Sequence, residues 1–176
     1  MKNEPKQVEQ DRNRRAATDL LNAAMTYARL ILKRYGELGP FGFGMNREGE
    51  IARQTVDIPR LPRDPERLWK LLGDHMAERV RRGAIQALAV GANVTLPEPS
   101  PEGYRDAVVL NIETDQGYAV QLTVPYRIYG GQLRNLLPRR IALGKTQMED
   151  AACRFFRPGE STAPEEVSRD VYPPGA

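Results

Sequence analysis

The chain has few of the residues from which catalytic and metal sites are most often built. Its 176 residues include one cysteine, Cys153, and one histidine, His75. A single cysteine excludes an intramolecular disulfide and a cysteine-rich zinc site, and it suits the reducing cytosol. We therefore expect no cofactor and no metal, and we expect a cytoplasmic location.

Long hydrophobic runs are also missing. The first fifteen residues are polar and lack the apolar core of a signal peptide, and no later run is long enough to span a bilayer. We expect a soluble protein that has no membrane among its partners.

The excess of positive charge is small. Lys and Arg number 26 and Asp and Glu number 23, a formal net charge of +3, which does not by itself indicate a nucleic-acid binder. The strongest basic feature is a run late in the chain: Arg134, Arg139, Arg140, Lys145, Arg154 and Arg157. On one face this run could contact phosphates, with Tyr126 and Tyr129 as stacking surfaces. A solvated basic face neutralised by the acidic tail is the favoured interpretation.

What the chain does contain is the pattern of a long antiparallel hairpin over residues 104–128, with a turn at 114–117. Apolar residues alternate with polar ones, which is typical of half-buried strands. We expect Asn111 and Glu113 on a wet face and helices on the other side of the sheet only. Pro125 has no N–H to donate, so it should lie at an edge, at a bulge or near the end of pairing. The expected buried face of the second strand holds Tyr118, Val120, Leu122, Val124, Tyr126 and Ile128.

The other elements follow from spacing and from turn residues. Helical spacing predicts a helix over residues 16–35, and a Pro-Phe-Gly strand over 40–45 turns into a strand over 50–58. Asp64 and Pro65 are typical of a helix start. Residues 84–96 favour a central strand, with a helix as the alternative, and a last helix is expected over 147–156. The fold class is α+β, a five-stranded antiparallel sheet in the order α-β-β-α-β-β-β-α, with helices packed on it. A polar tail over 1–15 and a Pro/Glu-rich tail over 158–176 flank a single domain, 16–157.

No motif identifies a catalytic site. Gly144-Lys145-Thr146 resembles the end of a phosphate-binding loop, but residues 146–149 fit a capping box better, because threonine and glutamate there would satisfy free amides at a helix start. His75, beside Asp74 and Glu78, could act as a base or a ligand, although a half-exposed helix histidine is the simpler interpretation. Cys153 is expected to be an inert packed thiol. The carboxylates Asp106, Glu113 and Asp115 show no sign of forming an acid/base pair.

Two hairpins carry a resemblance to known proteins. Pro40-Phe41-Gly42 with its turn at 46–49, and the hairpin from Asp106-Ala107 to Pro125-Tyr126, resemble a group of small uncharacterised bacterial proteins, over about residues 16–127. Glu48-Gly49 stands where Asp-Gly is common in that group. The resemblance implies a bacterial α+β protein of accessory or toxin-neutralising type. The element order is also similar to that of profilin-like and roadblock-type domains, which dimerise or scaffold partners, although fold analogy alone does not establish function.

The leading hypothesis is a non-enzymatic protein-interaction module of the immunity or accessory type, because no catalytic or metal motif is present. Its partner would be another protein or a second copy, bound at a sheet edge. The expected surface comprises Pro125, Tyr126 and Arg127 with Phe41 and Phe43; burial in the core is the alternative, and it is favoured for the two phenylalanines. The other candidate functions are a nucleic-acid-associated protein that uses the basic run over 134–157 and a small enzyme with a carboxylate or His75 site.

Overall fold

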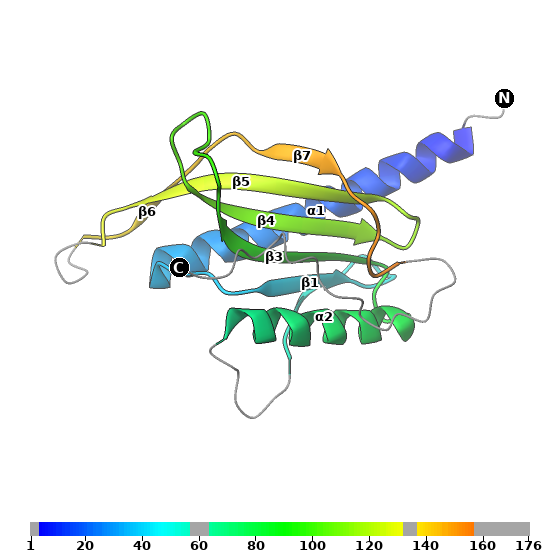
Figure 1. Cartoon of the computed structure of the whole chain (residues 1–176). Coiled ribbons are helices and arrows are strands. Elements are labelled where there is room, and N and C mark those ends of the chain that lie inside the picture. The colour runs from blue at the N-terminus through cyan, green and yellow to red at the C-terminus, as the bar shows by residue number, and fades with distance from the viewer. Residues whose placement is uncertain (1–3, 57–63, 132–136, 157–176) are drawn as a thin grey trace.

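The computed structural model describes residues 4–56, 64–131 and 137–156. It contains a seven-stranded antiparallel sheet and two helices (Figure 1). The elements are α1 (Glu4–Tyr35), β1 (Phe41–Met45), β2 (Ile51–Gln54), α2 (Pro65–Arg81), β3 (Ala87–Thr95), β4 (Asp106–Thr114), β5 (Ala119–Tyr129), β6 (Arg140–Leu143) and β7 (Gln147–Asp150). The α+β class is confirmed, whereas the predicted strand number and the predicted element order are wrong.

The strand order is β2-β1-β3-β4-β5-β6, and β7 also pairs with β5. The helix predicted over residues 147–156 is therefore replaced in part by a strand, since Gln147 to Asp150 pair with β5. Backbone pairing along the sheet overrides the local capping-box pattern, because such propensities are weak compared with tertiary contacts.

The long hairpin is confirmed. Strands β4 and β5 pair from Asp106↔Tyr126 to Glu113↔Ala119. The N–H of Gly117 donates to the carbonyl of Thr114 over 3.1 Å, and Gly117 has a φ of +78°, a conformation that most residues resist. Residues 87–95 form strand β3 between β1 and β4, so the strand interpretation of this stretch is correct.

Helix α1 begins at Glu4, within the stretch predicted as a polar tail. Glu, Gln, Lys and Arg are good helix formers, so the polar sequence extends the helix instead of ending it. Its buried stripe follows the helical period through Leu20, Ala24, Ala28 and Leu32. Thirty-two residues make the helix ~48 Å long, and its N-terminal end extends past the sheet (Figure 1).

Helix α2 begins as predicted. The side chain of Asp64 accepts a hydrogen bond from the N–H of Glu66 over 3.1 Å, and Pro65 occupies the first turn. Together these features satisfy or remove the free amides of the helix start. Of the strand predicted over 50–58, Ile51–Gln54 is observed, and residues 57 and 58 lie outside the described part.

The two faces of the sheet are covered by different helices, which corrects the prediction of a single covered side. Helix α1 packs on the face that contains Phe41, Phe43 and Leu110. On the opposite face, Leu72 and Met76 of α2 pack with residues from β3, including Leu88 and Val90. A Cβ at Gly42 would lie 3.3 Å from Leu72, so the glycine face of β1 admits the close approach of α2.

Opposite Pro125, the chain that pairs with the outer edge of β5 is divided into two short strands, β6 and β7. Leu143 of β6 pairs with Tyr126 and Gln147 of β7 pairs with Thr123, so three residues, 144–146, lie opposite two, 124–125. This is the count of a β-bulge. The carbonyl of Pro125 accepts the N–H of Gly144 over 2.7 Å, so the nitrogen of Pro125, which has no hydrogen, faces the same edge. The predicted placement of Pro125 at a bulge is confirmed.

Two glycine-to-alanine changes should have opposite effects on stability. A Cβ at Gly91 would lie 2.5 Å from Leu110 and 2.8 Å from Phe41, so Gly91→Ala overpacks the α1 side of the sheet and should lower the unfolding free energy by about 1–3 kcal/mol. Gly73 lies within α2, and a Cβ at this position would meet no other atom within 4 Å, so Gly73→Ala should raise the unfolding free energy by roughly 0.5–1 kcal/mol. Urea denaturation of both variants checks the pair; equal shifts would contradict the packing described above.

Candidate interaction surface

Four of the five residues expected to form an interaction surface are buried. Phe41 is 4% exposed, Phe43 8% and Tyr126 3%, and the side chain of Pro125 is fully buried. Phe41 and Phe43 pack against Tyr27 of α1, with ring centroids 5.3 and 5.8 Å from that of Tyr27. These side chains belong to the core, so the predicted surface is wrong at Pro125 and Tyr126, the favoured core interpretation of Phe41 and Phe43 is confirmed, and only Arg127 is exposed.

Tyr126 is held inside the sheet by a polar contact. Its hydroxyl donates to Oδ1 of Asn93 over 2.7 Å. Burial, and then the nearby Asp106 carboxylate, raise the pKa of Tyr126 well above its ordinary value, so the hydroxyl remains a donor. The three residues line part of a cleft of about 380 Å³ between the end of α1 and the start of α2.

Several exposed apolar side chains lie along the outer edge of β5. Seven large hydrophobic residues are exposed in the described part of the chain; three lie on α1, and the other four are in β5, before β6, in β6 and in β7. We call these four the outer edge cluster: Tyr129, Leu137, Leu143 and Met148.

The outer edge cluster includes a tyrosine whose position is fixed by neighbours. The guanidinium of Arg127 lies 5.2 Å from the ring centroid of Tyr129, within cation–π range. Burial and a side-chain hydrogen bond with Tyr129 raise the pKa of Tyr104. Tyr129 is nevertheless 45% exposed, so an ordered aromatic side chain faces solvent.

The predicted basic run does not form one patch in the described residues. Arg140 pairs with Tyr129 at the end of β5, whereas Arg154 donates its N–H to Glu113, which pairs with Ala119 at the start of β5. The two ends of β5 are ~33 Å apart. Arg139 donates to the carbonyl of Arg34 near the end of α1, and Lys145 is exposed between β6 and β7. Arg134 and Arg157 lie outside the described residues.

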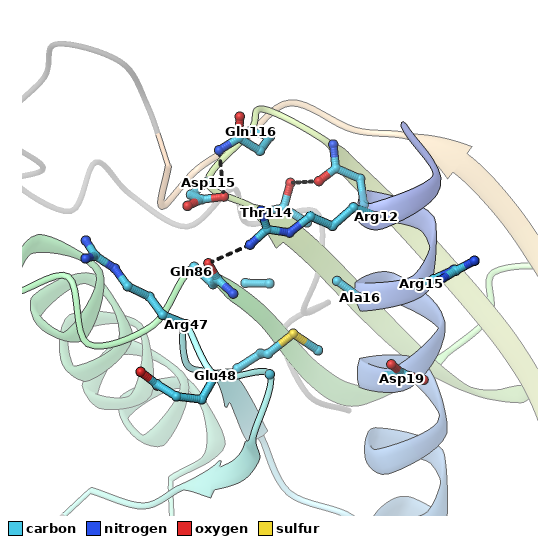
Figure 2. Close-up of a pocket in the computed structure, with 14 residues that line it drawn as sticks. Arg12, Arg15, Ala16, Asp19, Arg47, Glu48, Gln86, Thr114, Asp115 and Gln116 are labelled. Atoms are coloured by element: carbon cyan, nitrogen blue, oxygen red, sulfur yellow. Dashed lines mark hydrogen bonds between the residues drawn. The ribbon is translucent and has the colours of Figure 1, made fainter. Parts of the chain in front are cut away.

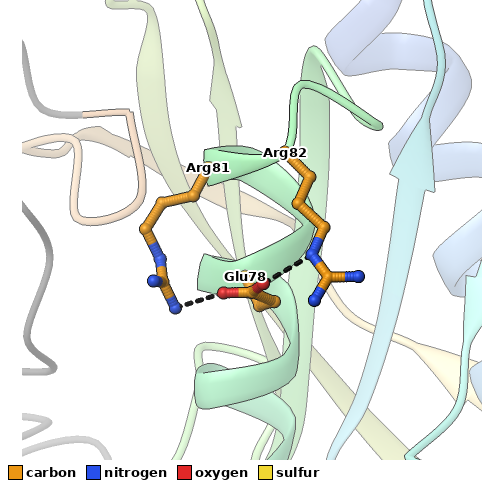
Figure 3. A network of polar contacts seen from close by, with 3 residues as sticks. All are labelled: Glu78, Arg81 and Arg82. Atoms are coloured by element: carbon orange, nitrogen blue, oxygen red, sulfur yellow. Dashed lines mark hydrogen bonds and ion pairs between the residues drawn. The ribbon is translucent and has the colours of Figure 1, made fainter.

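The histidine candidate lacks a carboxylate partner in the described part of the chain. His75 is half-buried in α2, and burial, followed by the charge of Arg79, lowers its pKa. Glu78, the nearest predicted partner, instead pairs with Arg81 and Arg82 on the same helix (Figure 3).

The other catalytic candidates are also separated. Burial, and then Glu113, raise the pKa of the Cys153 thiol, which opposes the thiolate that a nucleophile needs. Asp106 and Glu113 lie at opposite ends of β4, ~23 Å apart, and Asp115 lies in the turn after β4.

The Gly144-Lys145-Thr146 segment is neither a phosphate-binding loop nor a helix cap. It joins β6 to β7, so no helix follows it. The N–H of Lys145 donates to Oε1 of Glu102 over 2.9 Å, and the hydroxyl of Ser100 donates to Oε2 over 2.8 Å. These two bonds lower the pKa of Glu102, whose carboxylate fixes the loop before β4 to the bulge at Pro125.

A polar cleft of about 240 Å³ lies between α1, the turn after β1, the start of β3 and the turn after β4 (Figure 2). Arg12 donates across it to Oε1 of Gln86 over 3.3 Å, and Thr114 donates to Asn13 over 3.4 Å. The lining of this cleft includes as many carboxylates as guanidinium groups, so the cleft does not favour ligands of one sign of charge. The charged residues are Arg12, Arg15, Arg47, Asp19, Glu48 and Asp115.

The sequence interpretation missed a buried carboxylate. Glu113 was expected on a wet face, but it is 2% exposed. Its carboxylate accepts the N–H groups of Arg154, Phe155 and Phe156, over 2.9, 2.9 and 3.4 Å. The one sequence signal for this contact is the adjacent apolar pair Phe155-Phe156, which needs a place to pack.

Comparison with known proteins adds no assignment: no family model, no curated protein and no solved structure matches the chain. Within the described residues no group of histidine, cysteine and carboxylate side chains is placed to hold a metal ion. Neither described helix combines the length and the apolar character needed to cross a bilayer.

Stability should depend on pH through Glu113. Burial raises its pKa, against the opposing effect of the three hydrogen bonds, so the folded protein binds this proton more tightly than the unfolded chain does. The tighter proton binding stabilises the fold fully when the pH is below the pKa of Glu113 in the unfolded chain. This stabilisation is lost as the pH rises through the higher pKa of Glu113 in the folded protein. The wild-type urea midpoint, relative to that of Glu113→Gln, should therefore fall as pH rises from 4.5, the ordinary pKa of a glutamate, through the higher folded pKa.

A matched variant controls for charge in that measurement. Glu149→Gln removes an exposed carboxylate of β7. A Glu113→Gln difference that rises with pH, or one that Glu149→Gln reproduces, would contradict the role given to the buried carboxylate.

Proposed function

We propose that the protein is a non-enzymatic interaction module, of the accessory or toxin-neutralising type, and that it binds a partner protein through the outer edge cluster. The observation that carries the proposal is the presence of four exposed apolar side chains, Tyr129, Leu137, Leu143 and Met148, along the β5–β6–β7 edge of the sheet, with Arg127 beside Tyr129. Aromatic residues, Met and Arg are enriched at the centres of protein interfaces.

The Arg127–Tyr129 pair supports this choice of surface. Ordering a free side chain on binding costs about 0.5–1.5 kcal/mol. The contact with Arg127 already restricts Tyr129, so less of that cost is left for the binding step. A restricted, half-exposed tyrosine is a common form of binding hot spot.

The same edge is poorly suited to the addition of a strand. Strands β6 and β7 have four residues each, and a bulge separates them. Short edge strands, bulges and charged residues such as Arg140 and Lys145 hinder pairing with another strand. The partner is therefore expected to dock on side chains instead of extending the sheet.

The separation of the catalytic candidates supports a function other than catalysis. His75 makes no hydrogen bond to a carboxylate in the described residues, and Cys153 has a raised pKa. The described members of the basic run lie at both ends of β5, which leaves less support for nucleic-acid binding.

Two tyrosine variants test the surface. Tyr129→Ala should weaken binding to a partner captured from a cell lysate at least tenfold, since truncation of a hot-spot residue costs about 2 kcal/mol or more. Tyr35→Ala is the matched control, because Tyr35 is also exposed and also lies beside an arginine, Arg34, but on α1. Titration calorimetry with the purified partner measures both affinities. Equal losses in the two variants, or capture of no stoichiometric partner by a protein that light scattering shows to be a monomer, would contradict the proposal.

A further inference from the structure

The segment after β7 is held by an unusual contact. Oε1 of Glu113 accepts the N–H of Arg154 over 2.9 Å, and Oε2 accepts those of Phe155 and Phe156 over 2.9 and 3.4 Å. Successive backbone N–H groups that converge on one anion form a concave anion site. Here the anion belongs to the sheet, and the N–H groups belong to a segment that lies on it.

The buried carboxylate depends on that segment. A carboxylate that is 2% exposed is costly unless hydrogen bonds replace the lost water. The three backbone N–H groups are the donors that the structure shows for Glu113. When the segment leaves, water can reach the carboxylate, so release does not create an unsatisfied buried charge.

The surface that residues 154–156 cover around Glu113 is apolar. Glu113 pairs with Leu88 across the sheet, and Leu88 belongs to a buried cluster with Met76 of α2. Phe155 and Phe156 pack against this cluster, as does Trp69. This surface, which we call the Glu113 site, therefore combines apolar side chains with one acceptor group.

The mode of recognition does not depend on this particular segment. All three hydrogen bonds use backbone N–H groups, which any residue other than proline supplies. The segment is half-buried, and its last sheet-type bond is from the N–H of Ala151 to the carbonyl of Ala119, over 3.1 Å. Peptide-binding sites commonly gain affinity from main-chain hydrogen bonds and specificity from side-chain packing.

We propose that the Glu113 site binds an extended protein segment with two consecutive aromatic residues. Residues 154–156 occupy it in cis, and a segment of the same chemistry from a partner protein takes their place. The site lies at the start of β5, ~33 Å from Tyr129 at the other end of that strand, and it does not rest on the function proposed for the outer edge cluster.

The test uses the full chain with a weakened cis segment. Phe155→Ala/Phe156→Ala keeps the backbone N–H groups but removes the aromatic contacts. The probe is a synthetic peptide of residues 150–156 with Cys153→Ser, followed through Trp69, the only tryptophan in the chain, which packs on the same cluster.

The double variant should bind the peptide at micromolar concentration, and the wild type at least tenfold more weakly, because its own segment competes. Glu113→Ala added to the double variant should reduce the affinity at least tenfold. A peptide N-methylated at Phe155, which lacks one of the three donors, should also bind at least tenfold more weakly. Leu30→Ala, at an exposed apolar position of α1 that belongs to neither proposed surface, is the matched control and should bind like the wild type.

Several outcomes would overturn the proposal: no binding to the double variant at millimolar peptide, equal affinity for the double variant and the wild type, or no effect of Glu113→Ala. If the double variant does not fold, as judged by circular dichroism, Phe156→Ala alone replaces it, since it removes one of the two aromatic contacts and keeps the other. A wild-type dimer that Phe156→Ala converts to a monomer would also overturn it, because a second copy would then be the occupant.

Discussion

Strand β4 is buried on both faces over eight of its nine residues. Side chains alternate along a strand, so this burial requires a layer on each side of the sheet. Helix α1 provides one layer, and α2, with Phe155 and Phe156, packs on the other. Glu113 is in the same strand, and the segment of residues 154–156 covers its carboxylate and supplies its hydrogen bonds. The segment after β7 thus completes the burial of β4.

Pro125 imposes a second constraint, on the outer edge. Its nitrogen cannot donate, so pairing along β5 is interrupted and a bulge separates β6 from β7. At this interruption the carboxylate of Glu102 accepts the N–H of Lys145, which holds the bulged segment in place. Because the edge is divided, a long exposed strand is avoided, and the proposed contact with another protein is expected through side chains such as Tyr129.

The parts of the fold that the sequence predicted are those determined by local pattern. The hairpin over residues 104–128 and the start of α2 at Asp64 belong to this class. The parts that it missed depend on distant contacts. Thr146 begins a capping-box pattern but precedes a strand, because β5 offers an unpaired edge there. Glu113 occupies a polar position in the alternation but is buried by a segment about forty residues later, a contact that periodicity does not encode.

The distance between the two candidate sites, and the sheet that lies between them, argue against coupling between partners bound at the two sites. Tyr129 lies at the end of β5, and Ala119, the pairing residue of Glu113, lies at its start, ~33 Å away. Between them β5 is paired with β4 and is part of a core that α1 covers. Coupling between distant sites needs an element with two arrangements, and a continuous antiparallel ladder does not provide one. The segment at residues 154–156 is different, since its departure leaves a hydrated carboxylate and not an unsatisfied charge. Any switch in this protein is therefore expected at the Glu113 site, and the proposed surface at the outer edge cluster is expected to stay fixed.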